Sequence, residues 1–218
     1  ALRERGVTKG DRVAILSHNN RAFVILRFAT ARLGAILTPI NFMLNAPEIA
    51  YILEHSGAAL FIAEDALCAI VDEAIAQSHW KPARRVFVQH TGATPPLGWE
   101  CADDWFDKDL GPFERVEIDE DDPIQLMYTS GTESKPKGAL LTSRALFAQY
   151  ASCIAGGEMV ANDISLNALP LYHCAQLDAF MTVDLHVGAT SILLRGADPA
   201  LILDTIERAR VTKFFCPP

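Results

Sequence analysis

The chain alternates short apolar runs with longer stretches in which apolar residues recur every three or four positions. Runs of about four to eight apolar residues between turn residues are typical of buried strands, and the wider spacing is typical of amphipathic helices. The runs that predict strands are 13–16, 35–40, 59–63, 85–88, 124–127, 140–141, 165–170, 190–194 and 214–215. The segments that predict helices are 21–33, 47–55, 64–77, 144–154, 175–185 and 199–209. This alternation predicts an α/β fold with parallel sheets built from βαβ units.

The stretch 90–122 interrupts this alternation, because it is rich in proline, glycine and acidic residues. Such a composition is typical of a connector between two folded parts. We expect Trp99 and Trp105 to pin the connector to the body of the protein, because large apolar side chains are rarely left in water. The acidic run 119–122 is interpreted as a solvated loop and not as a metal site.

The connector divides the chain into two expected subdomains. The first is an α/β subdomain over residues 1–120, and the second covers residues 121–218 and contains the loop 128–138 described below. The chain opens on what reads as the last turn of a helix and closes just after a strand. We therefore expect the first subdomain to be truncated at its start and the second at its end, within a larger protein.

Composition excludes several classes of function. Of the 218 residues, 50% are hydrophobic and 21% are charged, as in globular proteins, and the formal charge is 19 − 27 = −8. This acidic balance argues against a nucleic-acid partner or an anionic membrane surface. Charges such as Asp178 and Asp184 break the apolar stretches, so no transmembrane segment is expected. The five cysteines are scattered without a paired spacing, which favours reduced thiols and a cytoplasmic location.

The segment 128–138 reads Tyr-Thr-Ser-Gly-Thr-Glu-Ser-Lys-Pro-Lys-Gly and follows an apolar run directly. Its glycines allow the backbone to approach an anion closely, its hydroxyls can donate hydrogen bonds, and Lys137 supplies a positive charge. A phosphate-binding loop has this composition, although an exposed turn between two strands has it too. The segment is not a Walker A loop, because Gly138 follows Lys137 where that motif has serine or threonine. The apolar residues after Gly138 indicate that the loop joins two strands and does not open a helix.

This segment resembles the phosphate-loop signature of the adenylate-forming enzymes, which reads Tyr-Thr-Ser-Gly-Thr-Thr-Gly-x-Pro-Lys-Gly-Val. Residues 128–132 and 136–138 match it in register, whereas Glu133, Ser134 and Ala139 depart from it. The segments 6–14 and 34–41 also resemble the opening of this family. The resemblance covers nearly the whole chain, and within the family it is most like the fatty-acyl-CoA synthetases. It implies two mostly parallel sheets flanked by helices, as in part of the large N-terminal domain of these enzymes.

The resemblance also implies an activity and its cofactors. Enzymes of this family activate a carboxylic acid with ATP and Mg²⁺ to an acyl-adenylate and usually transfer the acyl group to coenzyme A. It implies catalytic roles for Lys137 and Thr132. The residues that it implies for nucleotide binding are Thr129, Ser130, Gly131, Thr132, Glu133, Lys137 and Gly138. Glu133 would place an acid beside the triphosphate, where a like-charge pair at 4 Å costs about 4 kcal/mol at an effective dielectric of 20.

The segment Leu169-Pro170-Leu171-Tyr172-His173 resembles the Leu-Pro-Leu-Phe-His segment of acyl- and aryl-CoA synthetases. The resemblance implies that Tyr172 and His173 bind the acid substrate, and the alternative is that both side chains serve the core. Amino-acid-activating relatives carry an acid here, so a fatty or aromatic acid is expected and an amino acid is not. A zinc site around His173-Cys174 and His186 would lack a third and a fourth ligand at a suitable spacing, and no metal ligands are assigned.

We therefore interpret the chain as part of an AMP-forming acid–thiol ligase, with a small carboxylic acid, most simply a fatty acid, as its substrate. Later motifs of the family lie outside it, so the chain alone is expected to be inactive and to need the remainder of its enzyme. Alternatives are an aryl-CoA ligase, a fatty-acyl-AMP ligase, a non-catalytic nucleotide- or acyl-binding module of the same ancestry, and an unrelated α/β protein. The acceptor and the chain length of the acid are left open.

Overall fold

A computed structural model describes residues 1–105, 114–129 and 135–216. The chain forms two compact units, one of residues 1–17 and 21–143, the other of residues 18–20 and 144–218. The division falls after Ser143, later than the boundary expected near residue 120. The reason is that strands β6 (Pro123–Tyr128) and β7 (Gly138–Thr142) extend the sheet of the first unit, so the loop 128–138 belongs to that unit.

The first unit is built on a seven-stranded sheet in the order β5-β4-β3-β1-β2-β6-β7. Its other strands are β1 (Arg12–Leu16), β2 (Ile36–Ile40), β3 (Leu60–Glu64), β4 (Arg84–Val88) and β5 (Glu100–Cys101). All neighbouring strands pair in parallel except β6 and β7, which are antiparallel. The sheet is thus mostly parallel, as the sequence predicts, with one hairpin at its end.

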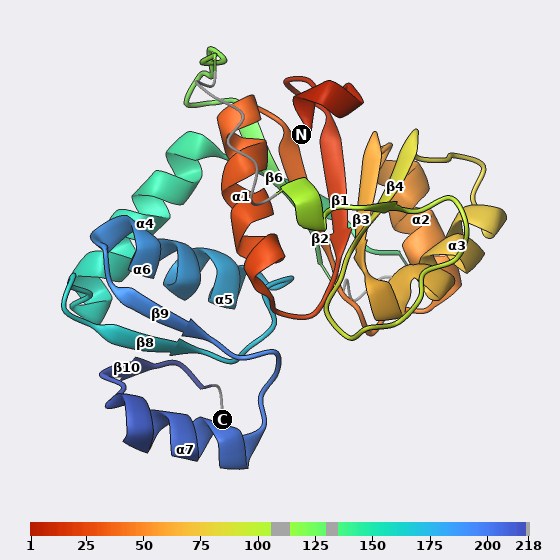
Figure 1. Ribbon diagram of the computed structural model, residues 1–218. Coiled ribbons are helices and arrows are strands. Elements are labelled where there is room, and N and C mark those ends of the chain that lie inside the picture. Colours follow the sequence, from red (N-terminus) through yellow and green to blue (C-terminus); the bar gives the residue numbers. More distant parts are fainter. Residues whose placement is uncertain (106–113, 130–134, 217–218) are drawn as a thin grey trace. The chain divides into compact units, whose positions relative to one another are not determined.

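Three helices cover the two faces of this sheet: α1 (Arg21–Leu33), α2 (Ala46–Ser56) and α3 (Cys68–Gln77). The chain moves one way along the sheet from β1 to β2 and the other way from β2 to β3 and β4. Because such crossovers are right-handed, the reversal places α1 on one face and α2 with α3 on the opposite face (Figure 1). Short 3₁₀ turns at Arg3–Arg5, Asp65–Leu67 and Asp103–Trp105 complete the unit.

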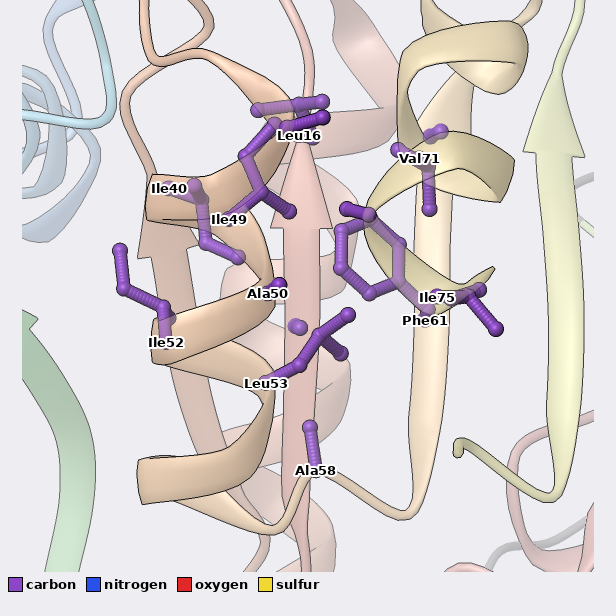
Figure 2. Packing of buried hydrophobic residues seen from close by; sticks show 14 of the residues in the cluster. Leu16, Ile40, Ile49, Ala50, Ile52, Leu53, Ala58, Phe61, Val71 and Ile75 are labelled. Carbon is purple, nitrogen blue, oxygen red and sulfur yellow. The ribbon is translucent and has the colours of Figure 1, made fainter. Parts of the chain in front are cut away.

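The main core lies between the sheet and the pair α2 and α3. Figure 2 shows Leu16 and Phe61 of the strands packed against Leu53 of α2 and Val71 of α3, all of them fully buried. Residues that alternate along a strand point to opposite faces, so neighbours such as Ile15 face the side of α1. Burial on both faces explains why these strands read as continuous apolar runs.

Both ends of α2 are fixed by local interactions. At its start, the side chain of Asn45 accepts from the backbone N–H of Glu48 (3.1 Å), and the Glu48 carboxylate accepts from the N–H of Asn45 (2.9 Å). This reciprocal pair is a capping box. At its end, Gly57 adopts a left-handed conformation (φ 57°), and Arg12 of β1 donates to the carbonyl oxygens of Ser56 (2.6 Å) and Gly57 (3.0 Å).

The connector is attached to the first unit through its tryptophans, as expected. The indole N–H of Trp99 lies 3.1 Å from both carboxylate oxygens of Asp72 on α3. The guanidinium of Arg5 lies 4.1 Å from the ring centroid of Trp105, within the range of a cation–π contact. The connector also contributes strand β5, which is too short for sequence periodicity to reveal.

The second unit contains a three-stranded parallel sheet in the order β10-β8-β9. Its elements are α4 (Ser143–Gly157), β8 (Ile164–Asn167), α5 (Cys174–Gln176), η4 (Leu177–Met181), α6 (Thr182–Val187), β9 (Thr190–Leu193), α7 (Pro199–Ala209) and β10 (Lys213–Phe214). The strand order again reverses, which puts α5 to α6 on one face and α7 on the other (Figure 1). The fold is therefore α/β with two mostly parallel sheets flanked by helices.

The segment 175–185, predicted to be helical, is helical throughout in the second unit, and its centre is the π-helical segment η4. The backbone N–H of Thr182 donates to the carbonyl oxygen of Leu177, and the Thr182 hydroxyl donates to the same oxygen across 2.7 Å. A side-chain hydroxyl that bonds back to the preceding turn competes with regular helix geometry.

Within the part of the chain that is described, no helix is both long and apolar enough to cross a membrane.

Candidate functional site

The predicted phosphate-binding loop is the turn of the β6–β7 hairpin. Strand β6 ends at Tyr128, which pairs with Gly138 at the start of β7. Just beyond this pair, the backbone N–H of Thr129 donates to the carbonyl oxygen of Lys137 across 3.0 Å. The hydrogen bond closes the base of the loop. The prediction that the loop joins two strands is confirmed, because no helix follows it directly.

The residues assigned to this loop divide into two sets. Thr129, Lys137 and Gly138 are described and lie on the stems of the loop, where all three are exposed. The other residues assigned to nucleotide binding lie outside the described part of the chain: Ser130, Gly131, Thr132 and Glu133. The described set thus includes Lys137, the cation that the resemblance assigns to phosphate binding.

Helix α2 contacts both stems of the loop. On the β6 side, Nδ1 of His55 lies 2.8 Å from the hydroxyl of Tyr128, and the two rings meet edge to face. On the β7 side, the hydroxyl of Tyr51 donates to the carbonyl oxygen of Pro136 across 3.1 Å. The ammonium of Lys135 lies 5.4 Å from the centroid of the Tyr51 ring. Burial raises the pKa of Tyr128 to about 12, so its phenol stays protonated at neutral pH.

Gly138 fits closely among the same side chains. A Cβ atom at this position would lie 3.0 Å from Cδ1 of Leu126 and 3.5 Å from ring carbons of His55 and Tyr128. A side chain at this position would therefore require the end of the Leu126 side chain to move by a few tenths of an ångström. This gives a physical reason for the glycine of the Pro-Lys-Gly segment in this chain.

In the second unit, His173 caps the start of α5. Its side chain is exposed, and its Nδ1 accepts a hydrogen bond from the backbone N–H of Ala175 across 3.1 Å. An imidazole that accepts through Nδ1 carries its proton on Nε2 when it is neutral. The alternative in which His173 serves the core is not what the structure shows. Tyr172 beside it is half-buried, and burial raises the pKa of its phenol.

The turn that carries Tyr172 and His173 is held by two buried amides. The side chain of Asn19 donates to the carbonyl oxygens of Leu169 (2.8 Å) and Leu194 (3.0 Å) and accepts from the N–H of Leu171 (2.8 Å). The side chain of Gln176 accepts from the N–H of Leu169 across 3.1 Å. Asn19 and Gln176 are 3% and 1% exposed, so these bonds are shielded from water.

A buried polar network continues from Gln176 into the sheet of the second unit. Gln176 donates to Asn167, which donates to the carboxylate of Asp184 (3.0 Å) and to the hydroxyl of Ser191 (2.7 Å). The hydroxyl of Ser165 donates to the other oxygen of Asp184 across 2.7 Å. Asp184 is fully buried, and this burial raises its pKa even though the two donors favour the ionised form.

Sequence reasoning missed these supporting residues. Asn19 precedes a helix, where asparagine is typical of an N-cap, so its local context gives no sign of its bonds to Leu169 and Leu171. Asp184 lies in an amphipathic stretch and reads as a solvent-facing charge. Both roles depend on partners that are distant in the sequence.

The second unit also contains a shallow cavity of about 280 Å³. It is lined by Gln149, Ser152, Cys153, Gly156, Gly157, Met159, Ala179 and Phe180. Neither Tyr172 nor His173 lines it, so this cavity does not test their assignment to the acid substrate. Across residues 1–105, 114–129 and 135–216, no group of three or more histidine, cysteine or acidic side chains could hold a metal ion.

Comparison with known proteins identifies relatives of the whole chain. A family model described as AMP-binding enzyme matches residues 1–218. Feruloyl-CoA synthase from Amycolatopsis sp is 32% identical over 217 residues, which cover 100% of this chain and 40% of that protein. Long-chain-fatty-acid–CoA ligase FadD13 from Mycobacterium tuberculosis is 30% identical over 206 residues, 94% of this chain and 39% of that protein.

A solved structure agrees with these relatives. The crystal structure of ATP-bound MatB from Rhodopseudomonas palustris matches with a TM-score of 0.80 and 26% identity, and it covers 98% of this chain and 40% of that one. The chain therefore spans about 40% of the length of the curated relatives named above.

Proposed function

Since the chain belongs to the AMP-binding enzyme family, we propose that the full-length gene product activates a carboxylic acid with ATP and transfers the acyl group to coenzyme A. In the first step a carboxylate oxygen bonds to the α-phosphorus of ATP, and the bond to the β-phosphate breaks to release pyrophosphate. In the second step the sulfur of coenzyme A bonds to the acyl carbon, AMP leaves, and the thiol proton passes to solvent.

The observation that carries this proposal is the position of Lys137. Tyr128 and Thr129 lie on one stem of the hairpin and Pro136 to Gly138 on the other, and Lys137 is exposed at the base of the turn. A lysine there can stabilise the negative charge that develops on the β- and γ-phosphates as pyrophosphate leaves. The exposed Thr129 supplies a hydroxyl at the other stem. Thr132, also assigned a catalytic role, is proposed on the sequence match alone.

Magnesium would enter as the complex with ATP, where it neutralises phosphate charge. No described side chain is assigned as its ligand. The residues of this chain contribute positive charge and hydrogen-bond donors to the phosphates, and the carboxylate of the substrate is the nucleophile. The protein therefore needs no nucleophilic side chain for either step.

The proposed acid has no α-amino group. Tyr172 and His173 end the turn beyond β8, at the carboxyl end of a parallel strand, where ligands bind in open α/β sheets. Neither residue is acidic, so this position offers no partner for a substrate ammonium. The exposed Nε2–H of His173 can donate to the substrate carboxylate. The names of the relatives include both an aromatic and a long-chain fatty substrate, and we propose an acid of one of these two classes.

The test is acid-dependent exchange between pyrophosphate and ATP by the full-length gene product, with ferulate and palmitate as probes. We expect exchange with one of the two acids and a loss of about a hundredfold or more in the Lys137→Ala variant. Lys81→Ala, which removes an exposed lysine on the loop before β4, is the matched control and should retain the exchange rate. Unchanged exchange in Lys137→Ala would contradict the assignment of the loop.

A second candidate is a nucleotide-binding module that has lost the chemistry. Glu133 and Ser134 depart from the family signature at positions close to the expected phosphates, which favours this alternative. Such a module would bind ATP in calorimetric titration with no exchange for either acid. Binding that is weakened by Lys137→Ala together with an absence of exchange would support it over the ligase.

A further inference from the structure

Helix α2 contacts both stems of the loop from one face. Tyr51 and His55 are four residues apart, one helical turn, and their rings stack with centroids 5.6 Å apart. Tyr51 reaches Pro136 on the β7 stem, and His55 reaches Tyr128 on the β6 stem. The two partners lie 85 and 73 residues away in the sequence. Neighbouring side chains of one helix thus fix two points on opposite sides of the loop.

These contacts are specific polar interactions. His55 is exposed and Tyr51 is half-buried, whereas the residues of α2 that fill the core include Ile49, Ile52 and Leu53. Truncation of His55 would therefore leave the main core of the first unit in place. The hydrogen bond between His55 and Tyr128 forms in either tautomer of the imidazole, because the phenol can donate to a bare Nδ1 or accept from a protonated one.

The position of the two contacts determines what they can influence. Tyr128 immediately precedes Thr129, and Pro136 immediately precedes Lys137. Thr129 and Lys137 are joined by the hydrogen bond at the base of the loop. A displacement of either anchored residue therefore moves Thr129 or Lys137, both of which we assign to contact with the nucleotide. A ligand-binding group that is held in place before binding loses less conformational entropy when the ligand arrives.

We propose that Tyr51 and His55 are positioning residues that hold the stems of the nucleotide-binding loop in register with α2. The inference rests on the proposed function of the loop. Neither residue is assigned a contact with ATP or the acid: His55 acts through Tyr128, and Tyr51 acts through Pro136. Their loss should weaken the binding of ATP and leave the binding of the acid unchanged.

The experiment compares variants of the full-length gene product in the exchange assay. His55→Ala removes one anchor, and Tyr51→Phe removes only the hydroxyl that bonds Pro136. We expect each to raise the KM for ATP about fivefold, the effect of one hydrogen bond, while the KM for the acid stays unchanged. The lost hydrogen bond should lower the thermal unfolding midpoint by only a few degrees, so each variant remains folded in the assay. His55→Asn places an amide oxygen near the former Nδ1 and should restore much of the loss. His79→Ala, at an exposed histidine, is the matched control.

A double-mutant cycle identifies the partner of His55. If the imidazole acts through Tyr128, the variant that combines His55→Ala with Tyr128→Phe should have the same KM for ATP as either single variant. If the double variant instead raises the KM for ATP by the product of the two single effects, His55 does not act through Tyr128. An unchanged KM for ATP in both His55→Ala and Tyr51→Phe would overturn the inference, while loss of exchange in Lys137→Ala would leave the proposed function standing. Absence of ATP binding and of exchange in the wild-type protein would instead contradict the proposed function itself.

Discussion

The backbone N–H of Thr129 donates to the carbonyl oxygen of Lys137 across 3.0 Å, and the Thr129 hydroxyl lies 3.5 Å from the same oxygen. This pair closes the β6–β7 hairpin at the point where the described residues assigned to the nucleotide emerge from the sheet. The separation of the two residues is therefore set by the register of two antiparallel strands. Any activity of the loop therefore also depends on the pairing between Tyr128 and Gly138, which sets the spacing of its two stems.

The close fit around Gly138 gives a first prediction. Gly138→Val should lower the free energy of unfolding by about 1–3 kcal/mol, because the added methyl groups displace Leu126, His55 and Tyr128. It should also raise the KM for ATP, because the same displacement moves the stems of the loop. Chemical denaturation and the exchange assay measure the two effects. Gly196→Val is the control, since no atom lies within 4 Å of a Cβ built there; equal effects of the two substitutions would contradict this account.

Substitution can separate the N-cap role of His173 from its proposed role in substrate binding. Asparagine is a good N-cap residue, so His173→Asn should keep the hydrogen bond to the N–H of Ala175 and leave the thermal unfolding midpoint unchanged. If the imidazole binds the substrate carboxylate, the same variant should raise the KM for the acid. His173→Ala removes both functions and should also cost about 1 kcal/mol of stability. A wild-type KM for the acid in His173→Asn would leave His173 as a cap alone.

The buried carboxyl of Asp184 predicts an unusual pH dependence. Burial raises its pKa in the folded state above the ordinary value of 3.8, so the folded protein binds this proton more tightly than the unfolded chain. Its contribution to stability should therefore fall as the pH rises from 3.8 through the raised folded pKa. Asp184→Asn removes this dependence and can still accept from Asn167. Urea denaturation of the wild-type protein and of Asp184→Asn between pH 4 and 8 measures how the free energy of unfolding of each depends on pH.

A second substitution tests the network around Asp184 itself. Asp184→Ala leaves the buried donors of Ser165 and Asn167 without their acceptor, which should cost about 1–3 kcal/mol. Asp184→Asn should cost less, because its amide retains polar partners. Equal stability of the alanine and asparagine variants would show that the network does not stabilise the second unit.

Asp65 predicts the opposite pH dependence in the first unit. Burial alone would raise the pKa of Asp65, but the hydrogen bonds that its carboxylate accepts outweigh burial and lower the pKa. The donors include the backbone and hydroxyl of Thr91 and the backbone N–H groups of Gly92 and Ala93. The carboxylate therefore adds stability above the ordinary pKa of 3.8, and this stability is lost as the pH falls through the lowered folded pKa.

Asp65→Asn should lose about 2 kcal/mol of stability near neutral pH, since an amide is a weaker acceptor than a carboxylate. The difference in the free energy of unfolding between this variant and the wild-type protein should become smaller in acid. Unfolding followed at pH 7 and at pH 3 measures both values. A gap of constant size would contradict the role given to the charge of Asp65.

Local signals in the sequence were sufficient for the elements that position the loop. The apolar runs on either side of the loop predicted its two strands, because β6 is largely buried and the turn residues between the strands break regular structure. Pro47 and Gly57 marked the ends of α2, because each has a conformational preference that acts within one turn. The resemblance of the loop to a known signature supplied the function that we propose for it.

The contacts that support the site could not be predicted in the same way. The bonds of Tyr51 and His55 to the loop and of Asn19 to Leu169 join residues far apart in the sequence, so no local pattern reports them. The π-helical turn was missed because the spacing of apolar residues in a sequence does not distinguish the backbone hydrogen bonds of a π-helix, which span five residues, from those of an α-helix, which span four. The two-residue strand β5 is shorter than any window in which periodicity can be measured.

The fixed ends of α2 have a consequence for the evolution of the loop. The capping box at Asn45 and the two hydrogen bonds from Arg12 fix the ends of α2, and none of these interactions involves the nucleotide. The stems of the loop therefore take their place while the protein folds, before any ligand is present. Substitutions at Asn45 or Arg12, remote from the phosphates, could then tune the affinity for ATP without altering a single residue that the nucleotide touches.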